Sequence, residues 1–419
     1  MRSLGLILAV VFAVITSLDY GCSNVNSPYQ NNPTPMPPLS LSEQKVESAN
    51  NSFATTLFSQ VAGQEQGKNF FISPLSVSMA LAMTLNGASG QTYTDMQQTL
   101  RLTGMSNQQI NQSYQNLIAM FSTLDPNVTF NIANSIWYRN TFSVLDSFLN
   151  VDSTYFDAKI AALNFNDPNS ADVINNWVSQ KTNGKIPSVV QSPLPGAAMM
   201  YLINALYFHG TWKYTFDYKN TKLGTFHLAN GSTESDSMMI MTDTLNYYSD
   251  QYFQVVELPY GKGDYSMLVL LPNSTSATNP IPTLDQSEVN AITNGLKPAD
   301  VTVTLPKFKL QYSTLLNSAL SQMGMGNAFS SAADFTRINP AGGLYISYVL
   351  HKTYIDVNEV GTEAAAVTVV GVYTTVVGPE PQPYMFNVNR PFIFLIKENH
   401  DNTFMFMGAI AQPSVQLSN

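Results

Sequence analysis

Apolar residues follow a helical spacing in the first well-patterned part of the chain, which begins near residue 40. Ser40 and Glu43 stand three positions apart, the spacing of a capping box, which marks the start of a helix. Apolar side chains then recur every three or four positions, at Val46, Ala49, Phe53, Leu57 and Val61. The pattern therefore predicts a long helix with one buried face.

The next stretch, "NFFISPLSVSMALAMTLNGASGQT", predicts a short strand and then a buried helix. The strand covers 69–72 and the helix covers 75–85. Pro74 suits the first turn of that helix, because the N–H that proline lacks has no helical partner there. Gly87 and Gly90 are expected to end the helix.

The rest of the chain contains both the helical spacing of apolar residues and the two-residue spacing of strands. A helix stopped at Gly184 is predicted in "ADVINNWVSQKTNGKI", and an apolar strand in "MYLINALYFHGTW". "FQVVELPY" and "YSMLVLLPN" form a predicted hairpin across "GKGD", and "VTVTLPKFKL" alternates as a single strand. A second hairpin, with a polar turn over 398–402, is predicted in "PFIFLIKENHDNTFMFMGAI". Since no internal repeat or second linker is visible, we expect one α+β domain.

Composition narrows the class of protein. Hydrophobic residues make up 44% of the 419-residue chain, which is enough for a full core. Charged residues make up only 11%, and the formal net charge is -9. Lys and Arg form no cluster, so nucleic acid is not an expected partner, because phosphate binding requires gathered cations.

The N-terminus has the pattern of an export signal. Arg2 precedes an apolar run from Leu4 to Ile15 that is too short to span a bilayer comfortably. We therefore predict a signal peptide over 1–21, a Pro-rich tether over 22–41 and a folded domain over 42–416.

Cys22, the only cysteine, follows the predicted signal directly. "GC" resembles the cleavage site of bacterial lipoproteins, which implies lipid attachment and a place at the bacterial cell surface or outer membrane. The alternative is a secreted protein whose cysteine is incidental. Both readings place the protein outside the cytoplasm.

Motifs of enzymatic chemistry are absent from the sequence. It contains no HExxH, CxxC or GxSxG, and no Gly-rich phosphate loop with Lys. The four histidines, His209, His227, His351 and His400, show no local pairing with a nucleophile. We expect no catalytic residues, no metal site and no cofactor.

Several stretches, taken in order from about residue 42 to 413, resemble the serpin family of serine protease inhibitors. They are "NFFISPLSVSMALAM", "GASGQT", "NNWVSQKTNGKI", "INALYFHGTW", "ELPYGKGDYSMLVLLP", "LPKFKL", "NVNRPFIFLI" and "FMFMGAI". The most specific, "NEVGTEAAAVTVV", is similar to the hinge of the family's reactive-centre loop. The resemblance implies a single α+β domain with a large central mixed β-sheet, further sheets, about eight to nine helices and an exposed loop over about 359–383.

The resemblance also implies a mechanism of inhibition. A protease attacks a bait bond in the loop and forms an acyl-enzyme, and the cleaved loop then inserts as a strand of the central sheet. The protease is trapped covalently and the inhibitor, expected to be a monomer, is consumed. The rival readings are a non-inhibitory serpin acting as a binding or chaperone protein, and a hydrolase on the same scaffold.

The predicted loop can be tested residue by residue as a strand that must enter a sheet. No proline lies between Glu359 and Gly378, which leaves every ladder N–H available. Alternate positions from Thr362 onward are small or apolar, and the charged Glu363 falls on the other face. The hinge is predicted at Glu359, Gly361, Thr362, Glu363, Ala364, Ala365 and Ala366. The alternative is an ordinary exposed strand and loop.

The bait bond is predicted at Thr375–Val376, at the family's usual spacing from Glu359. The loop is longer than in typical members, which leaves Tyr373, Thr374 and Val377 as further candidates. Neither Lys nor Arg occurs from Val360 to Asn389, so trypsin-like proteases should be poor targets. The small and β-branched residues favour elastase-like or subtilisin-like proteases, and chymotrypsin-like and papain-like ones stay open.

Five further positions match the family where its sheet opens. Ser73 and Ser76 match hydroxyls beneath the sheet, and Asn204 and His351 match their hydrogen-bonding partners. Trp212 matches an aromatic residue at the end of the sheet where the hinge first enters. Each residue also has a plain reading, as a helix cap, a satisfied core polar group or part of the core.

Overall fold

The computed structural model describes residues 36–274, 282–362 and 382–414. The helices in these ranges are α1 (Leu41–Glu65), α2 (Pro74–Asn86), α3 (Gly90–Thr99), α4 (Asn107–Thr123), α5 (Asp146–Phe156), α6 (Ser170–Lys181), α7 (Gln286–Gly295) and α8 (Asn317–Leu320). None of these helices has the length and apolar character needed to cross a bilayer. The capping box of α1 is present as predicted, and its five apolar positions are all buried.

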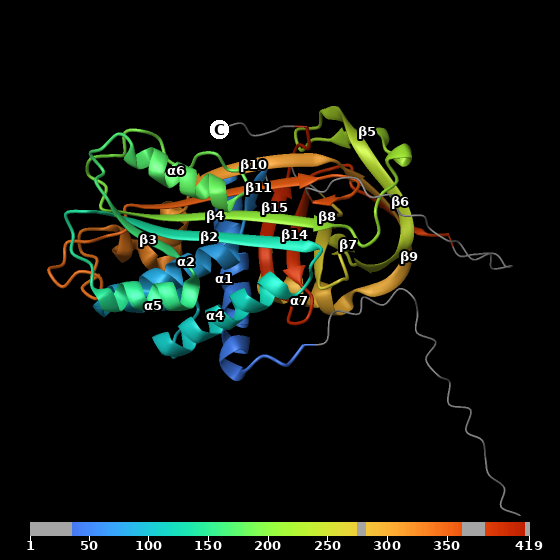
Figure 1. Cartoon of the computed structure of the whole chain (residues 1–419). Coiled ribbons are helices and arrows are strands. Elements are labelled where there is room, and N and C mark those ends of the chain that lie inside the picture. The colour runs from blue at the N-terminus through green and yellow to red at the C-terminus, as the bar shows by residue number, and fades with distance from the viewer. Residues whose placement is uncertain (1–35, 275–281, 363–381, 415–419) are drawn as a thin grey trace, which may run out of the picture. The chain divides into compact units, whose positions relative to one another are not determined.

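A six-stranded sheet has the order β10-β11-β12-β4-β2-β3 (Figure 1). Its strands are β2 (Val128–Arg139), β3 (Lys159–Leu163), β4 (Met200–Thr211), β10 (Phe308–Leu315), β11 (Tyr348–Val357) and β12 (Gly361–Thr362). Two of the pairings, β11–β4 and β2–β3, are parallel and the others are antiparallel. This is the mixed central sheet that the family resemblance implied.

A nine-stranded sheet packs against the first through a shared core. Its main path is β1-β15-β14-β8-β7-β6-β9-β13, and β5 pairs with β6. The strands are β1 (Phe70–Ile72), β5 (Lys222–His227), β6 (Thr233–Ser249), β7 (Phe253–Tyr260), β8 (Tyr265–Pro272), β9 (Lys297–Pro306), β13 (Tyr384–Asn387), β14 (Phe392–Glu398) and β15 (Phe404–Ile410). Both predicted hairpins, β7–β8 and β14–β15, are present and antiparallel.

Helix α2 lies between the two sheets. Ser73 is its N-cap and accepts a hydrogen bond from the Ser76 N–H, and the helix is buried from Pro74 to Leu85. It contacts β2 and β4 on one side and β15 on the other. A helix that is apolar on every side has to be enclosed in this way. The helix ends at its C-cap Gly87 as predicted, but Gly90 begins α3 instead of ending α2.

Helix α6 covers the outer face of the six-stranded sheet (Figure 1). Its apolar residues Ala171, Ile174 and Val178 form a separate core with Tyr201, Ile203 and Ala205 of β4. Successive strand residues point to opposite faces, so Asn204 of β4 points to the other face, where it meets Ser76 of α2. The helix ends at Lys181, one turn before Gly184, where the sequence placed its stop.

The prediction of one strand in "VTVTLPKFKL" is wrong. The segment forms the end of β9 and the start of β10, which belong to different sheets. Pro306 ends β9, because proline has no N–H to continue the ladder. Lys307 turns the chain, and its N–H donates to Ser237 O at 2.9 Å. Apolar and polar residues continue to alternate across this corner, so the sequence pattern gives no sign of the break.

Candidate functional site

A parallel seam runs between β4 and β11 in the middle of the six-stranded sheet. The two strands pair directly from Tyr201 and Tyr348 at one end to Tyr207 and Tyr354 at the other. Beyond that point β12 lies between them. Thr362 pairs with Val357 of β11 and with Gly210 of β4. β4 and β11 are therefore paired directly along the seam. At the end of the seam, Gly361 and Thr362 of β12 separate them.

The direction of β12 decides what the seam can accept. β12 is antiparallel to both β4 and β11, whereas those two strands are parallel to each other. A strand that continued β12 along the seam would replace one parallel ladder by two antiparallel ladders. Antiparallel pairing is slightly more stable per residue, and a second ladder adds backbone hydrogen bonds. A further strand could therefore pair with both β4 and β11 once the seam between them opened.

Two predicted hinge residues form β12. Thr362 is fully buried, and its hydroxyl lies 2.7 Å from the hydroxyl of Tyr260, to which it is hydrogen-bonded. Gly361 lies so close to β4 that an added Cβ would stand 2.1 Å from Gly210 O. Only glycine fits this approach, because the obstacle is backbone. The hinge is therefore seated in the sheet up to Thr362.

Trp212 holds the chain that leads into β12. Its backbone N–H donates to Val360 O at 2.8 Å, and its indole Nε1–H donates to Asn358 O at 2.9 Å. The indole ring stacks on Tyr260 with centroids 4.4 Å apart. Trp212 therefore lies beside the predicted hinge and is also buried in the core.

Glu359 is fixed by a cation that the sequence analysis did not identify. Lys307 Nζ lies 2.9 Å from Glu359 Oε2, and the Thr221 hydroxyl donates to Oε1 at 2.9 Å. Burial alone raises the pKa of Glu359, but the hydrogen bonds from Lys307 and Thr221 outweigh it, so this pKa is lowered. The hinge carboxylate is therefore charged and anchored at the corner between β9 and β10.

A buried polar cluster lies beneath the middle of the seam. His351 and Asn204 are direct register partners across it, and the ring Nδ1 lies 2.6 Å from Asn204 Oδ1. The Ser73 N–H donates to His351 Nε2 at 3.0 Å, and the Ser76 hydroxyl donates to Asn204 Oδ1 at 2.8 Å. The four predicted residues are thus brought together, and Asn134 joins them by accepting from Asn204 Nδ2.

These contacts fix one tautomer of His351. Because Nε2 accepts from a backbone N–H, the ring proton must be on Nδ1, which donates to Asn204. Burial lowers the pKa of His351 to about 3, so the ring is neutral. Ser73 also donates through its hydroxyl to Met405 O at 2.8 Å, which ties the cluster to the second sheet.

Several predicted residues lie outside the described part of the chain. They are Glu363, Ala364, Ala365 and Ala366 of the hinge, Tyr373, Thr374, Thr375, Val376 and Val377 around the bait bond, and Cys22 with the predicted signal. The residues that sequence reasoning missed are Lys307, Thr221, Tyr260 and Asn134. Their partners are distant in sequence, and no local spacing indicates them.

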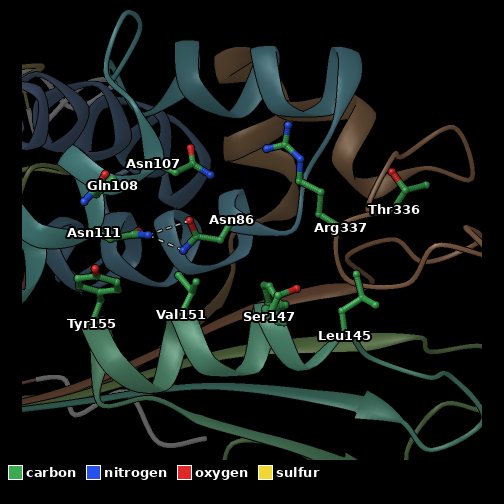
Figure 2. A pocket seen from close by; sticks show the side chains of 11 residues that line it. Asn86, Asn107, Gln108, Asn111, Leu145, Ser147, Val151, Tyr155, Thr336 and Arg337 are labelled. Carbon is green, nitrogen blue, oxygen red and sulfur yellow. Dashed lines mark hydrogen bonds between the residues drawn. The ribbon is translucent and has the colours of Figure 1, made fainter.

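A cavity of about 450 Å³ lies between α4 and α5 and shares no residue with the seam or hinge (Figure 2). Asn86 and Asn111 donate to each other's carbonyl oxygens, at 3.1 and 3.0 Å. Asn86 also donates to Asp152 at 2.9 Å. Burial raises the pKa of Asp152 well above its usual range. These polar groups bond one another and join α2, α4 and α5.

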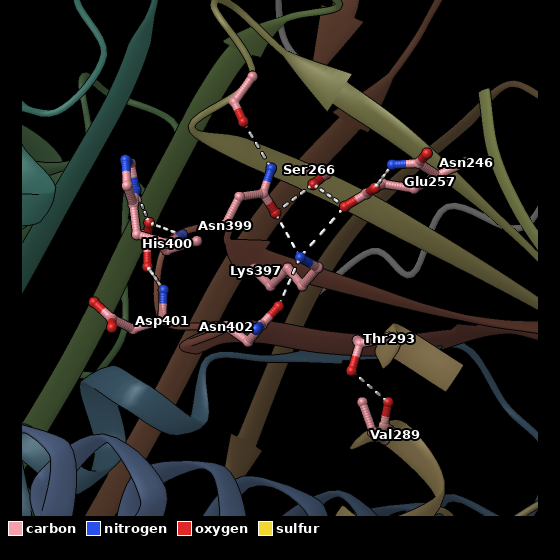
Figure 3. A network of polar contacts seen from close by, with 12 residues as sticks. Asn246, Glu257, Ser266, Val289, Thr293, Lys397, Asn399, His400, Asp401 and Asn402 are labelled. Atoms are coloured by element: carbon pink, nitrogen blue, oxygen red, sulfur yellow. Dashed lines mark hydrogen bonds and ion pairs between the residues drawn. The ribbon is translucent and has the colours of Figure 1, made fainter. Parts of the chain in front are cut away.

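A buried ion pair lies in the second sheet (Figure 3). Lys397 Nζ is 3.3 Å from Glu257 Oε1, and both residues are almost fully buried. Burial raises the pKa of Glu257, but Lys397 and the donors Asn246 and Ser266 outweigh that effect and lower it. The pair ties β14 to β7 and also lies outside the seam.

Comparison with known proteins points to one family. The family model described as "Serpin (serine protease inhibitor)" matches residues 48–413. The intracellular coagulation inhibitor 2 of Tachypleus tridentatus is 33% identical over 378 residues, which cover 88% of this chain and 92% of that protein. The leukocyte elastase inhibitor of Bos taurus is 33% identical over 382 residues, covering 88% of this chain and 100% of the relative. The native-state crystal structure of the thermophilic serpin tengpin superposes with a TM-score of 0.78 at 31% identity, covering 91% of this chain and 97% of that one.

Proposed function

The chain belongs to the serpin family of serine protease inhibitors, and on this premise we propose that it traps a target serine protease as a suicide substrate. One observation carries the proposal. Thr362 is buried between β4 and β11 and begins a strand antiparallel to both. The neighbouring seam is closed by a parallel pairing, with a small polar cluster beneath it.

The proposed reaction begins at the bond between Thr375 and Val376. The protease serine oxygen forms an ester with the Thr375 carbonyl carbon, and the Val376 nitrogen leaves as an amine on the C-terminal fragment. The chain that follows Thr362 then extends β12 along the seam. The His351–Asn204 hydrogen bond crosses the seam and has to break at this step. The acyl-enzyme is carried away from the loop's original position before water can hydrolyse it.

The loop sequence supports small, apolar specificity. Thr375 and its neighbours fit elastase-like or subtilisin-like pockets, and Tyr373 would serve a chymotrypsin-like protease. A papain-like cysteine protease is a further candidate target. The name of the bovine relative, leukocyte elastase inhibitor, agrees with an elastase-like target.

We also propose that the protein acts outside the cytoplasm, as a monomer on a tether. The apolar run from Leu4 to Ile15 supports export, and the prolines of residues 22–41 support a semi-rigid spacer. Cys22 is the proposed lipid attachment site at a bacterial surface. Mass spectrometry of the mature N-terminal peptide tests the proposed lipid attachment. A mature chain that begins with a lipid-modified Cys22 would support it. A longer or unmodified N-terminus would contradict it.

The decisive experiment is incubation with pancreatic elastase, subtilisin, chymotrypsin and trypsin, followed by denaturing gels and mass spectrometry of the released peptide. A complex that survives denaturation, with a peptide beginning at Val376, is the expected result. Trypsin should form no complex. Cleavage without any complex would contradict inhibition and favour a non-inhibitory serpin that acts as a binding or chaperone protein.

A further inference from the structure

A groove of about 860 Å³ lies where the chain re-enters the nine-stranded sheet after the predicted loop. Its walls come from the end of β6, from the junction of α7 with β9 and from the start of β13. Its lining includes Tyr247, Tyr248, Gly295, Lys297, Asp300 and Tyr384. None of them belongs to the seam or to the hinge.

The aromatic wall of this groove is both ordered and exposed. Tyr384 remains 58% exposed although its ring stacks on Tyr247 with centroids 5.0 Å apart. Tyr247 in turn meets Phe386 edge-on at 6.4 Å. Behind them Tyr248 packs so closely on Gly295 that an added Cβ would lie 2.6 Å from its ring. A tyrosine held by stacking offers contact area with little conformational entropy left to lose.

The rim of the groove is polar and carries both charges. Lys297 and Asp300 are exposed at the start of β9, and Asp300 accepts a hydrogen bond from the Thr244 hydroxyl at 2.6 Å. An aromatic centre with a polar rim is the anatomy of protein–protein interfaces, in which Tyr is enriched. The groove is therefore better suited to a protein surface than to an isolated ion.

Its position relative to the bait bond indicates which protein. Gln382 lines the groove and is the first described residue after the segment 363–381. The chain from Val376 to Gln382 can span at most about 20 Å when extended. A protease bound to the bait bond covers about 800 Å² of its partner, a patch roughly 30 Å across. The groove therefore lies within reach of the body of an attacking protease.

We propose that this groove is a second docking surface for the target protease, used before the bait bond is cut. The inference rests on the proposed inhibitory function and adds to it a contact outside the loop. The protease would place an aromatic or basic side chain of a surface loop on the exposed face of Tyr384, where stacking and cation–π attraction are both available. Lys297 and Asp300 would orient that loop at the rim.

The test compares variants by the second-order rate constant of complex formation with the protease that wild type traps fastest. Tyr384→Ala is expected to lower this constant about tenfold, which corresponds to about 1.4 kcal/mol of docking free energy. Ser249→Trp, which fills the groove from an exposed lining position, should lower it as well. Tyr384→Phe keeps the ring and should retain the wild-type rate. Leu145→Ala, at the partly exposed N-cap position before α5, is the distant control.

A second measurement separates this inference from the proposed function. The affinity of each variant for the same protease with its serine replaced by alanine reports docking without acylation. If wild type traps the protease and Tyr384→Ala and Ser249→Trp keep its rate and affinity, the docking surface is wrong and inhibition stands. If wild type is only cleaved, but both variants bind the inactive protease more weakly, inhibition is wrong and the docking surface stands. If wild type binds no protease, both are overturned.

Discussion

The imidazole of His351 on β11 donates a hydrogen bond to the carboxamide oxygen of Asn204, its direct register partner on β4, at 2.6 Å. This contact crosses the seam at the level where the N-terminus of α2 presents Ser73 and Ser76. The backbone pairing of β4 with β11 and the His351–Asn204 hydrogen bond therefore hold the same seam closed. Only one assignment of donors and acceptors satisfies His351, Asn204, Ser73 and Ser76 together. It requires the imidazole of His351 to be neutral.

Acid should weaken the native fold through His351. Its pKa is lowered from 6.5 to about 3 by burial, so the unfolded chain takes up the proton first as the pH falls. The stabilisation is complete above pH 6.5 and is lost progressively toward pH 3, by about 1.4 kcal/mol per pH unit. Denaturant unfolding between pH 4 and 8 should show a shallower pH dependence in His351→Gln than in wild type. Equal slopes in the two proteins would contradict the assignment.

Thr362→Arg should convert the inhibitor into a substrate. The Thr362 side chain is fully buried between β4 and β11, and a guanidinium there would be enclosed without a counter-charge. We expect cleavage by the target protease at the wild-type site, with a stable complex reduced at least tenfold, as measured on denaturing gels. Thr362→Ser keeps the hydroxyl that bonds Tyr260 and is the matched control. Undiminished complex formation by Thr362→Arg would show that β12 does not lead insertion.

Glu359→Lys should loosen the hinge without touching the seam. The substitution removes the ion pair with Lys307 and brings two like charges together. Because Lys307 is partly exposed, we expect a loss of about 1 kcal/mol in the free energy of unfolding. The exchanged pair, Glu359→Lys with Lys307→Glu, should recover part of it, and a double-mutant cycle by denaturant unfolding measures the coupling. Strictly additive losses would mean that the two side chains act independently.

Lys397→Ala should be far more destabilising than the change at the hinge. It leaves the Glu257 carboxylate buried without its cation, for which about 3–5 kcal/mol is expected. The double variant Lys397→Leu with Glu257→Leu removes both charges and should unfold at a higher denaturant concentration than Lys397→Ala. If the single variant is as stable as wild type, the ion pair does not hold β14 to β7.

The sequence predicted those parts of the protein that depend on local pattern or on family resemblance. The capping box at Ser40, the buried helix after Pro74 and both hairpins follow from periodicity and turn residues. Ser73, Ser76, Asn204 and His351 were grouped by resemblance, and the structure brings them within hydrogen-bonding distance.

What the sequence did not predict depends on pairing between distant segments. Lys307 meets Glu359 only because the chain turns a corner after Pro306, and alternation through that corner concealed it. Tyr260 lies in the nine-stranded sheet and Thr362 in the six-stranded sheet. The sequence around neither residue indicates the hydrogen bond between them. The docking groove combines β6, β9 and β13, which no single stretch of sequence contains.

The parallel pairing of β4 and β11 affects both the stability of the resting fold and the ease with which the seam opens. A substitution that tightens this ladder, for example by improving the packing of Tyr201 on Tyr348, makes the resting molecule harder to unfold. It also makes the seam harder to part, and under the proposed mechanism a protease that is not captured quickly completes hydrolysis and escapes. Under that mechanism, a higher melting temperature gained at this seam would mark a poorer inhibitor.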